Sequence, residues 1–189
     1  MKKLHEMLTD YVIRKGMVEE SDREMYEYAF QITVEVGLFA VVCFVIALYV
    51  NMLVEGLLFF IIFVPLRSYA GGLHMETFKS CFCLSCLAFS CVLLTVGYLE
   101  IPGLFSISFL LLLEFIVYTL SPVDNENREV DEEEDTWFKK KLRNFLFFDF
   151  CMAVFCLLFR KERYLLLIAA TFLLIVISML AGKSKLPHV

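Results

Sequence analysis

A histidine and a cysteine seven residues apart are the side chains of this sequence best suited to covalent chemistry. His74 follows the glycine pair Gly71 and Gly72, and Cys81 comes at the start of a long apolar run. The other two histidines lie near the two ends of the chain. An imidazole can take the proton of a thiol, which then attacks a carbonyl carbon as a thiolate. The spacing predicts Cys81 as a nucleophile with His74 as its base, against the alternative that His74 makes only structural hydrogen bonds.

Helical geometry selects Cys81 among the neighbouring thiols. At about 100° per residue, position 81 returns to nearly the same helical face as His74, whereas Cys83 points almost opposite and Cys86 lies about a third of a turn away. An unbroken helix through His74 and Cys81 would separate the two by about 10.5 Å along its axis, too far for a hydrogen bond. Because the glycine pair can reach backbone conformations closed to other residues, the chain could fold His74 back over the next helix. The pair therefore requires a helix that does not include His74.

Other interpretations of the cysteine-rich segment stay open. The Cys-x-Cys-x-x-Cys run that begins at Cys81 offers, together with His74, enough ligands for zinc, but a helix spreads the thiols around its circumference. The later thiols of this run suit packing between membrane helices. A serine hydrolase using Ser80 or Ser85 would lack a nucleophile-elbow pattern and would compete with an adjacent thiol. We expect no metal and no cofactor.

Two basic features could bind a substrate. Arg67 stands at the expected end of an apolar block, where it either reaches lipid phosphates or holds a carboxylate or a developing oxyanion. Lys139, Lys140 and Lys141 follow eight acids between residues 124 and 135. That segment is either a solvated loop with a basic anchor against anionic lipid or a docking strip for a charged peptide. Arg67, the glycine pair and the three lysines are therefore the predicted substrate-binding or oxyanion residues.

Composition places the chain in a bilayer. Hydrophobic residues make up 60% of its 189 residues, 20 of them are phenylalanine, and the mean hydropathy is +0.74. The apolar residues come in blocks close to the ~20 residues that a helix needs to cross the hydrocarbon core, without the alternation of a barrel. The predicted spans are 31–50, 53–69, 79–99, 104–120, 143–159 and 164–181. We expect an all-α, polytopic bundle of about six transmembrane helices over residues 31–181, within a single membrane-embedded domain of residues 1–189.

Residues 1–20 lack the apolar core of a signal peptide, and we expect them to form an amphipathic leader instead. The apolar residues that recur at helical spacing are Leu4, Met7, Leu8, Tyr11 and Val12. Such a helix suits either the membrane surface or the ends of the bundle, and Gly16 would end it. Ser21 and Glu24 form a capping-box pattern for a second helix that could run on into the first span.

Lysine and arginine predict the orientation. They concentrate in the leader, after the second span, in the charged loop 121–142 and at the C-terminus, all of which an even number of spans puts on one side. The opposite side holds only Arg160, Lys161 and Arg163. The positive-inside rule then makes both termini and the Cys81 site cytoplasmic in a multi-pass protein of the cell membrane.

Taken in order, these residues resemble the AgrB family (accessory gene regulator B). The pattern consists of Arg67, Gly71-Gly72-x-His74, Cys81 seven residues after the histidine, and Ser121-Pro122-Val123-Asp124 with Asn127 after the fourth span. The similarity extends over nearly the whole chain, including its length, its six-span outline and its charged leader.

The resemblance implies a cytoplasm-facing cysteine endopeptidase of Gram-positive bacteria that processes the AgrD-type precursor of a quorum-sensing peptide. In that family a histidine assists a cysteine, which expels the charged C-terminal tail and holds the signal as an acyl-enzyme thioester. An internal Cys or Ser then captures the acyl group, giving a cyclic thiolactone or lactone autoinducing peptide. Transferred to this sequence, Cys81 is the nucleophile and His74 the general base. The implied partners are the propeptide, membrane lipid and a second copy in a homodimer, and we expect no nucleic acid.

The rival function, from another class, is a small membrane transporter or scaffold for a peptide, without covalent catalysis. In that hypothesis Arg67, Glu114 and the glycine pair line a substrate path. An acid near mid-span, as Glu114 is, costs free energy unless it is paired or protonated, and the sequence shows no obvious partner for it.

Overall fold

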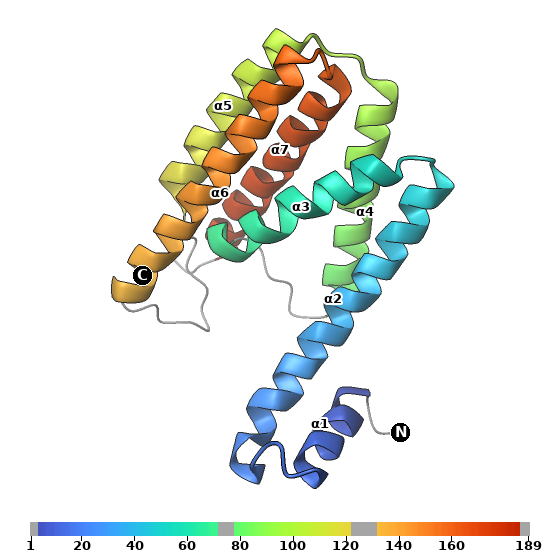
Figure 1. The fold of residues 1–189 in the computed structure, drawn as a ribbon, viewed down its shortest axis with the longest axis vertical. Coiled ribbons are helices and arrows are strands. Elements are labelled where there is room, and N and C mark those ends of the chain that lie inside the picture. Colours follow the sequence, from blue (N-terminus) through green and yellow to red (C-terminus); the bar gives the residue numbers. More distant parts are fainter. Residues whose placement is uncertain (1–3, 72–77, 122–131, 186–189) are drawn as a thin grey trace.

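The structure, a computed structural model, describes residues 4–71, 78–121 and 132–185 and is helical throughout (Figure 1). Its helices are α1 (Leu4–Arg14), the short 3-10 helix η1 (Glu20–Asp22), α2 (Arg23–Tyr49), α3 (Leu53–Ala70), α4 (Phe78–Tyr98), α5 (Gly103–Leu120), α6 (Glu132–Leu158) and α7 (Glu162–Lys185). Among the described residues, α2, α3, α4, α5 and α7 are long and apolar enough to cross a membrane. The prediction of an all-α multi-pass membrane bundle is confirmed.

Helix α7 lies at the centre of the bundle, where it contacts α3, α4, α5 and α6 (Figure 1). One apolar core joins α3, α5, α6 and α7 around Leu66, Leu110 and Phe172, and a second joins α2, α3, α4 and α7 around Phe59 and Phe89. Consecutive residues 165–169 of α7 are all buried, because the two cores cover different sides of the helix. This explains why α7 is apolar around its whole circumference.

Small residues let α2 and α3 approach each other closely. A Cβ added at Gly56 would stand 2.9 Å from the Cβ of Ala47, closer than two carbon atoms can pack. Membrane helices commonly use glycine and alanine at such contacts, since lipid supplies no hydrophobic drive for association and packing must provide it.

Helices α2 and α6 begin earlier than the predicted spans 31–50 and 143–159. Hydropathy detects only the apolar part of a helix, whereas both helices continue through polar turns, from Arg23 and from Glu132. The apolar part of α6 is short and is interrupted by Asp149, so α6 is not among the five candidate spans. The other four predicted spans agree with their helices within a few residues.

The predicted leader helix is α1, and it packs against the start of α2. Gly16 ends it as expected, with a positive φ of 67° that few other residues adopt. The predicted capping box does not form: Asp22 precedes α2 without a side-chain cap, and the Ser21 hydroxyl lies 3.5 Å from the Glu19 carboxylate. An ion-pair network around Arg23 instead joins the two helices, with Arg23 Nη1 2.8 Å from Asp10 Oδ1.

Candidate active site

Arg67 and Gly71 form the end of α3 and fix the direction in which the chain leaves it. Gly71 has φ 78° and ψ −158°, a conformation that favours glycine and stops the helix. The Arg67 guanidinium donates a hydrogen bond from Nη1 to the carbonyl oxygen of Gly71. The sequence prediction of an unusual glycine backbone thus holds at Gly71. Gly72 and His74 lie within residues 72–77, outside the described residues.

Cys81 is the fourth residue of α4, which begins at Phe78, and its side chain is half-buried. It interacts electrostatically with the Arg67 guanidinium. The fold therefore brings together two predicted site residues that belong to different helices. We call this end of the bundle, where α3 ends and α4 begins, the Cys81 end.

The other thiols of the cysteine run have different surroundings. Cys83 is exposed, whereas Cys86 turns toward α2 and contacts the thiol of Cys43. Cys43 is fully buried in the second core. These positions agree with the helical arithmetic that set Cys81 apart and with a packing role for Cys86.

An aromatic cluster that the sequence interpretation missed ties the end of α3 to α6. The Tyr69 ring stacks on Phe145 at a centroid distance of 5.4 Å, with Phe138 at 5.8 Å and Trp137 at 5.9 Å. Trp137 also lies under Lys141, whose Nζ is 5.4 Å from the ring centroid. The only tryptophan of the chain stands next to the lysine run, and this was the one sign in the sequence that the start of α6 packs against another helix.

The predicted basic strip, Lys139 to Lys141, is exposed on the early part of α6. Because Tyr69 holds this part of α6 beside the end of α3, the strip lies at the Cys81 end as well. The sequence placed the lysines and Arg67 in one aqueous compartment. The aromatic contacts bring the helices that carry them side by side.

One buried acid of the bundle has a partner that the sequence did not indicate. Glu114 in α5 and Asp149 in α6 form no such pair, because two carboxylates repel each other; Asp149 is only 2% exposed. Glu55, 6% exposed in the first turn of α3, forms an ion pair with Arg163 in the first turn of α7, at 2.9 Å between Oε1 and Nε. The basic residues of the last hairpin, which depart from the positive-inside pattern, thus include the partner of a buried carboxylate.

The Glu55–Arg163 pair gives a stability prediction. Arg163→Gln should lower the free energy of unfolding by about 1–3 kcal/mol, because it leaves a buried carboxylate without its partner. The measurement is thermal unfolding of the full chain in detergent. Lys161→Gln removes an exposed neighbouring base and should change nothing, and Glu55→Gln combined with Arg163→Gln should recover part of the loss. Equal unfolding temperatures for Arg163→Gln and the unaltered chain would contradict the role of this pair.

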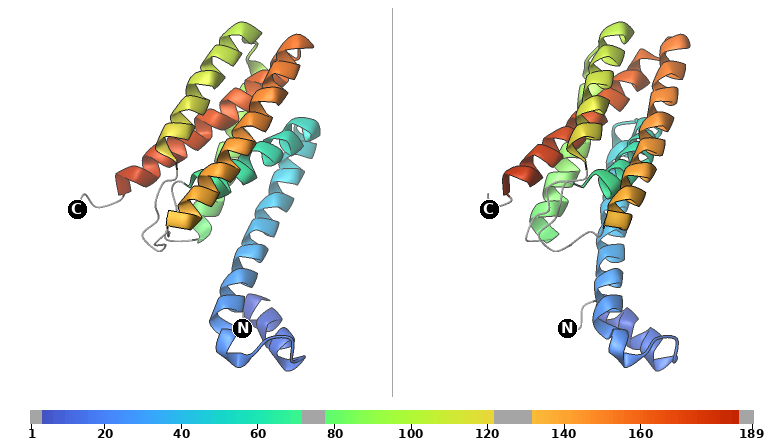
Figure 2. Two further views of the ribbon diagram at one scale, coloured as in Figure 1. Left: turned by 60° about the vertical axis from the view of Figure 1, so that its left-hand side comes forward. Right: turned by 90° about the vertical axis from the view of Figure 1, so that its left-hand side faces the viewer.

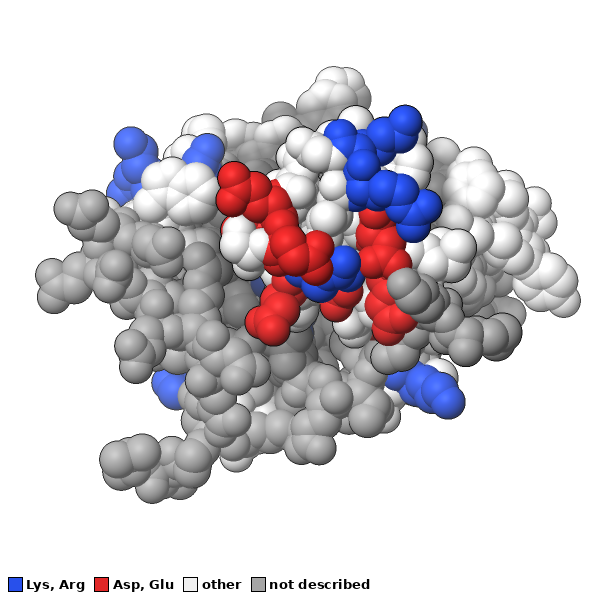
Figure 3. Space-filling model, turned by 90° about the horizontal axis from the view of Figure 1, so that it is seen from below, with Lys and Arg blue, Asp and Glu red and all other residues white. Residues whose placement is uncertain are grey.

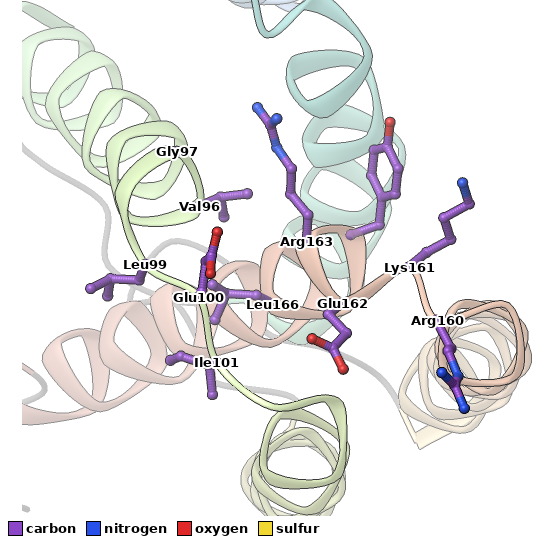
Figure 4. A pocket seen from close by; sticks show the side chains of 11 residues that line it. Val96, Gly97, Leu99, Glu100, Ile101, Arg160, Lys161, Glu162, Arg163 and Leu166 are labelled. Atoms are coloured by element: carbon purple, nitrogen blue, oxygen red, sulfur yellow. The ribbon is translucent and has the colours of Figure 1, made fainter.

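A pocket of about 460 Å³ lies at the opposite end of the bundle, between the α4–α5 connection and the start of α7 (Figure 4). Arg160 and Lys161 lie at one edge and extend outward, away from Glu100 (Figure 4). Glu162 Oε1 accepts a hydrogen bond of 3.4 Å from the backbone N–H of Gly103, at the start of α5. Because Cys81 lies at the other end, this pocket is no part of the candidate active site.

Comparison with known proteins identifies the family of this chain. The model of the AgrB family, Accessory gene regulator B, matches residues 5–179, a range that includes Arg67, His74 and Cys81. An AgrB-like protein from Clostridium perfringens (strain SM101 / Type A) is 25% identical over 150 residues, which are 76% of this chain and 68% of that protein. No solved structure matches the chain. The chain therefore belongs to the AgrB family, whose members process the propeptide of the agr quorum-sensing system.

Proposed function

We propose that the protein is a membrane-embedded cysteine endopeptidase that cleaves an AgrD-type propeptide and promotes its cyclisation. The observation that carries the proposal is the electrostatic interaction of Arg67, near the end of α3, with Cys81, in the first turn of α4. In the sequence these residues flank the segment that contains His74. A thiol, a permanently charged guanidinium and an imidazole within one short stretch of the sequence are the groups that acyl transfer to sulfur requires.

The reaction begins when His74 takes the proton of the Cys81 thiol and the thiolate attacks the carbonyl carbon at the scissile bond. The carbonyl oxygen becomes an oxyanion, which the Arg67 guanidinium stabilises. The carbon–nitrogen bond then breaks, and His74 gives the proton to the leaving amine of the C-terminal tail. The signal peptide stays on Cys81 as a thioester.

Cyclisation follows when an internal Cys or Ser of the bound peptide attacks that thioester. A new thioester or ester closes the ring, and Cys81 leaves as a thiolate that recovers its proton. The thioester keeps most of the reactivity of the acyl group, so a ring forms in place of a free acid if water is kept from the site. A site at the border of the hydrocarbon core suits this requirement.

Substrate binding in this proposal uses the Cys81 end of the bundle. The exposed lysines 139–141 offer charge for the tail, and the exposed apolar surfaces of the helices face lipid. The concentration of lysine and arginine at this end supports a cytoplasmic active site. Membership of the family supports action as a homodimer.

A trapping experiment tests the proposal. The purified protein in nanodiscs is mixed with an AgrD-type propeptide and quenched within a single turnover, and the peptide–enzyme adduct is mapped by mass spectrometry. We expect an adduct on Cys81 that neutral hydroxylamine removes, because hydroxylamine cleaves thioesters. An adduct on Cys83, or release of the tail with no adduct at any time, would overturn the thioester mechanism. Movement of uncleaved peptide into vesicles would favour the transporter hypothesis.

A further inference from the structure

Helix α2 carries one apolar stripe that packs into the bundle along only half of its length. Phe39, Cys43 and Ala47 belong to the packed half and contact the second core. At 3.6 residues per turn the same helical face continues toward the N-terminus. The residues of this continuation, which we call the α2 stripe, are Met25, Tyr28, Ile32 and Val36, and they are 62%, 68%, 41% and 54% exposed.

The α2 stripe lies beyond the start of α4, at the Cys81 end. Helices α2 and α4 run in the same direction, and Cys43 contacts Cys86 across their interface. Helix α4 begins eight residues before Cys86, and eight residues before Cys43 the chain is at residue 35. The first three turns of α2 therefore project past α4, as Figure 2 shows. The stripe continues the face of α2 that packs on α3 and α4, and it lies at the Cys81 end of the bundle.

Lipid does not account for the whole stripe. A helix needs about 20 residues to cross the hydrocarbon core. Counted back from Tyr49, where α2 ends, this length reaches Phe30. Met25 and Tyr28 then lie outside the hydrocarbon, where exposed apolar side chains are costly unless something covers them.

Helix α1 does not cover the stripe, because the ion pairs of Arg23 hold it elsewhere. Arg23 binds Asp10 of α1 and also pairs with Glu20 and Glu27. It lies nine residues before Ile32, which is about half a turn around the helix. The network therefore keeps α1 on the other side of α2.

The charge beside the stripe indicates the kind of partner. Glu24 and Glu35 flank it on one side, whereas Glu20 and Glu27 pair with Arg23 on the opposite side of α2. Figure 3 shows acidic side chains gathered around a basic one at this end of the molecule. An apolar stripe bordered by carboxylates matches a helix whose own apolar face is bordered by lysine or arginine, the helix-in-groove type of recognition.

We propose that the α2 stripe docks a basic amphipathic helix and that this helix is part of the peptide substrate. The binding chemistry follows from the stripe alone, whereas its assignment to the substrate rests on the proposed function. Docking there holds the substrate next to the Cys81 end before the scissile bond reaches the thiol. Loss of docking then raises KM and leaves kcat unchanged, because Met25 to Val36 are remote from the reacting atoms.

The binding test uses the full chain in phosphatidylcholine nanodiscs and a fluorescent 18-residue peptide of leucine and lysine in amphipathic order. Anisotropy should show binding about tenfold tighter than to empty nanodiscs, and Ile32→Ser should weaken it by a similar factor. The matched control is Leu38→Ser, which alters a side chain 47% exposed on another face of α2 and should bind as the unaltered chain does. Equal binding to the Ile32→Ser protein, the unaltered chain and empty nanodiscs would mean that lipid alone holds the peptide, and would overturn the proposal.

A charge swap makes the test specific. Glu24→Lys combined with Glu35→Lys should weaken binding of the lysine peptide and strengthen binding of a leucine–glutamate peptide of the same pattern. If neither affinity changes, the carboxylates do not select the partner and the proposal fails. If Ile32→Ser instead lowers the yield of cross-linked dimers without changing peptide binding, the stripe is an interface between two copies and the proposal is overturned.

Kinetics separate this proposal from the proposed function. Ile32→Ser should raise the KM for propeptide cleavage about tenfold at unchanged kcat, while Leu38→Ser should match the unaltered enzyme. If the unaltered protein binds the peptide but never forms an adduct on Cys81, the endopeptidase is refuted while the docking surface is still supported. If Ile32→Ser cleaves the propeptide with an unchanged KM, the partner that binds the stripe is not the substrate.

Discussion

Cys81→Ala should abolish both release of the propeptide tail and the peptide–enzyme adduct. Removing the nucleophile of a covalent mechanism lowers kcat by about 10⁴-fold or more, since binding and oxyanion stabilisation alone remain. Alanine in the first turn of a helix is well tolerated, and the Cys81 side chain is only half-buried, so the fold should persist. The measurement is single-turnover cleavage in nanodiscs with thermal unfolding as the check on folding.

Cys83→Ala is the matched control for this substitution. Cys83 stands two residues further along α4, carries the same thiol and is exposed on a different face. The Cys83→Ala protein should cleave the propeptide and form the adduct as the unaltered enzyme does. Undiminished tail release by Cys81→Ala, or equal losses in the two variants, would be incompatible with Cys81 as the nucleophile.

The spans could be predicted from the sequence because the bilayer fixes their length. The block 53–69 corresponds to α3 and the block 104–120 to α5, with boundaries that differ by one residue at most. Where the helix continues into water, hydropathy no longer reports it. Hydropathy therefore missed the polar start of α6, which carries Trp137 and Phe138 of the aromatic cluster. The first turns of α2 were predicted from the Ser21–Glu24 pattern and not from hydropathy.

Contacts between distant residues could not be predicted from periodicity. Glu55 and Arg163 pair across the bundle only because α3 and α7 both begin at the same end. The sequence showed the two charges as isolated exceptions, one inside a span and one against the positive-inside pattern. The ion pair accounts for both charges, since each neutralises the other at the border of the hydrocarbon core.

The candidate site was predicted in its composition but not in its contacts. The types and spacing of Arg67, Gly71 and Cys81 indicated chemistry, because membrane helices rarely carry such polar groups without a purpose. The hydrogen bond from Arg67 to the Gly71 carbonyl is local to the end of α3, whereas the electrostatic interaction of Arg67 with Cys81 depends on where the fold places the start of α4. The sequence leaves Arg67 two roles, at lipid phosphates or at the substrate, and its electrostatic interaction with Cys81 is the reason to test the second.

Arg67→Gln should lower kcat for cleavage by about 10²–10³-fold, the usual cost of removing one group that stabilises an oxyanion. Glutamine keeps a hydrogen-bond donor that can reach the Gly71 carbonyl, but it removes the positive charge near Cys81. Arg67→Lys keeps the charge and loses the planar fork, so its kcat should lie between those of the unaltered enzyme and of Arg67→Gln. Ser68→Ala, at an exposed neighbour whose hydroxyl bonds the Val64 carbonyl, is the control and should be fully active.

The division of the loss between kcat and KM tells which charge Arg67 meets. A fall in kcat at constant KM places the guanidinium on an oxyanion that exists only in the transition state, because an interaction absent from the ground state cannot alter KM. A rise in KM at constant kcat would place it on a carboxylate that the substrate already carries. Full activity of Arg67→Gln with unchanged thermal unfolding would remove Arg67 from the reaction. Its approach to Cys81 would then be a consequence of how it holds the end of α3.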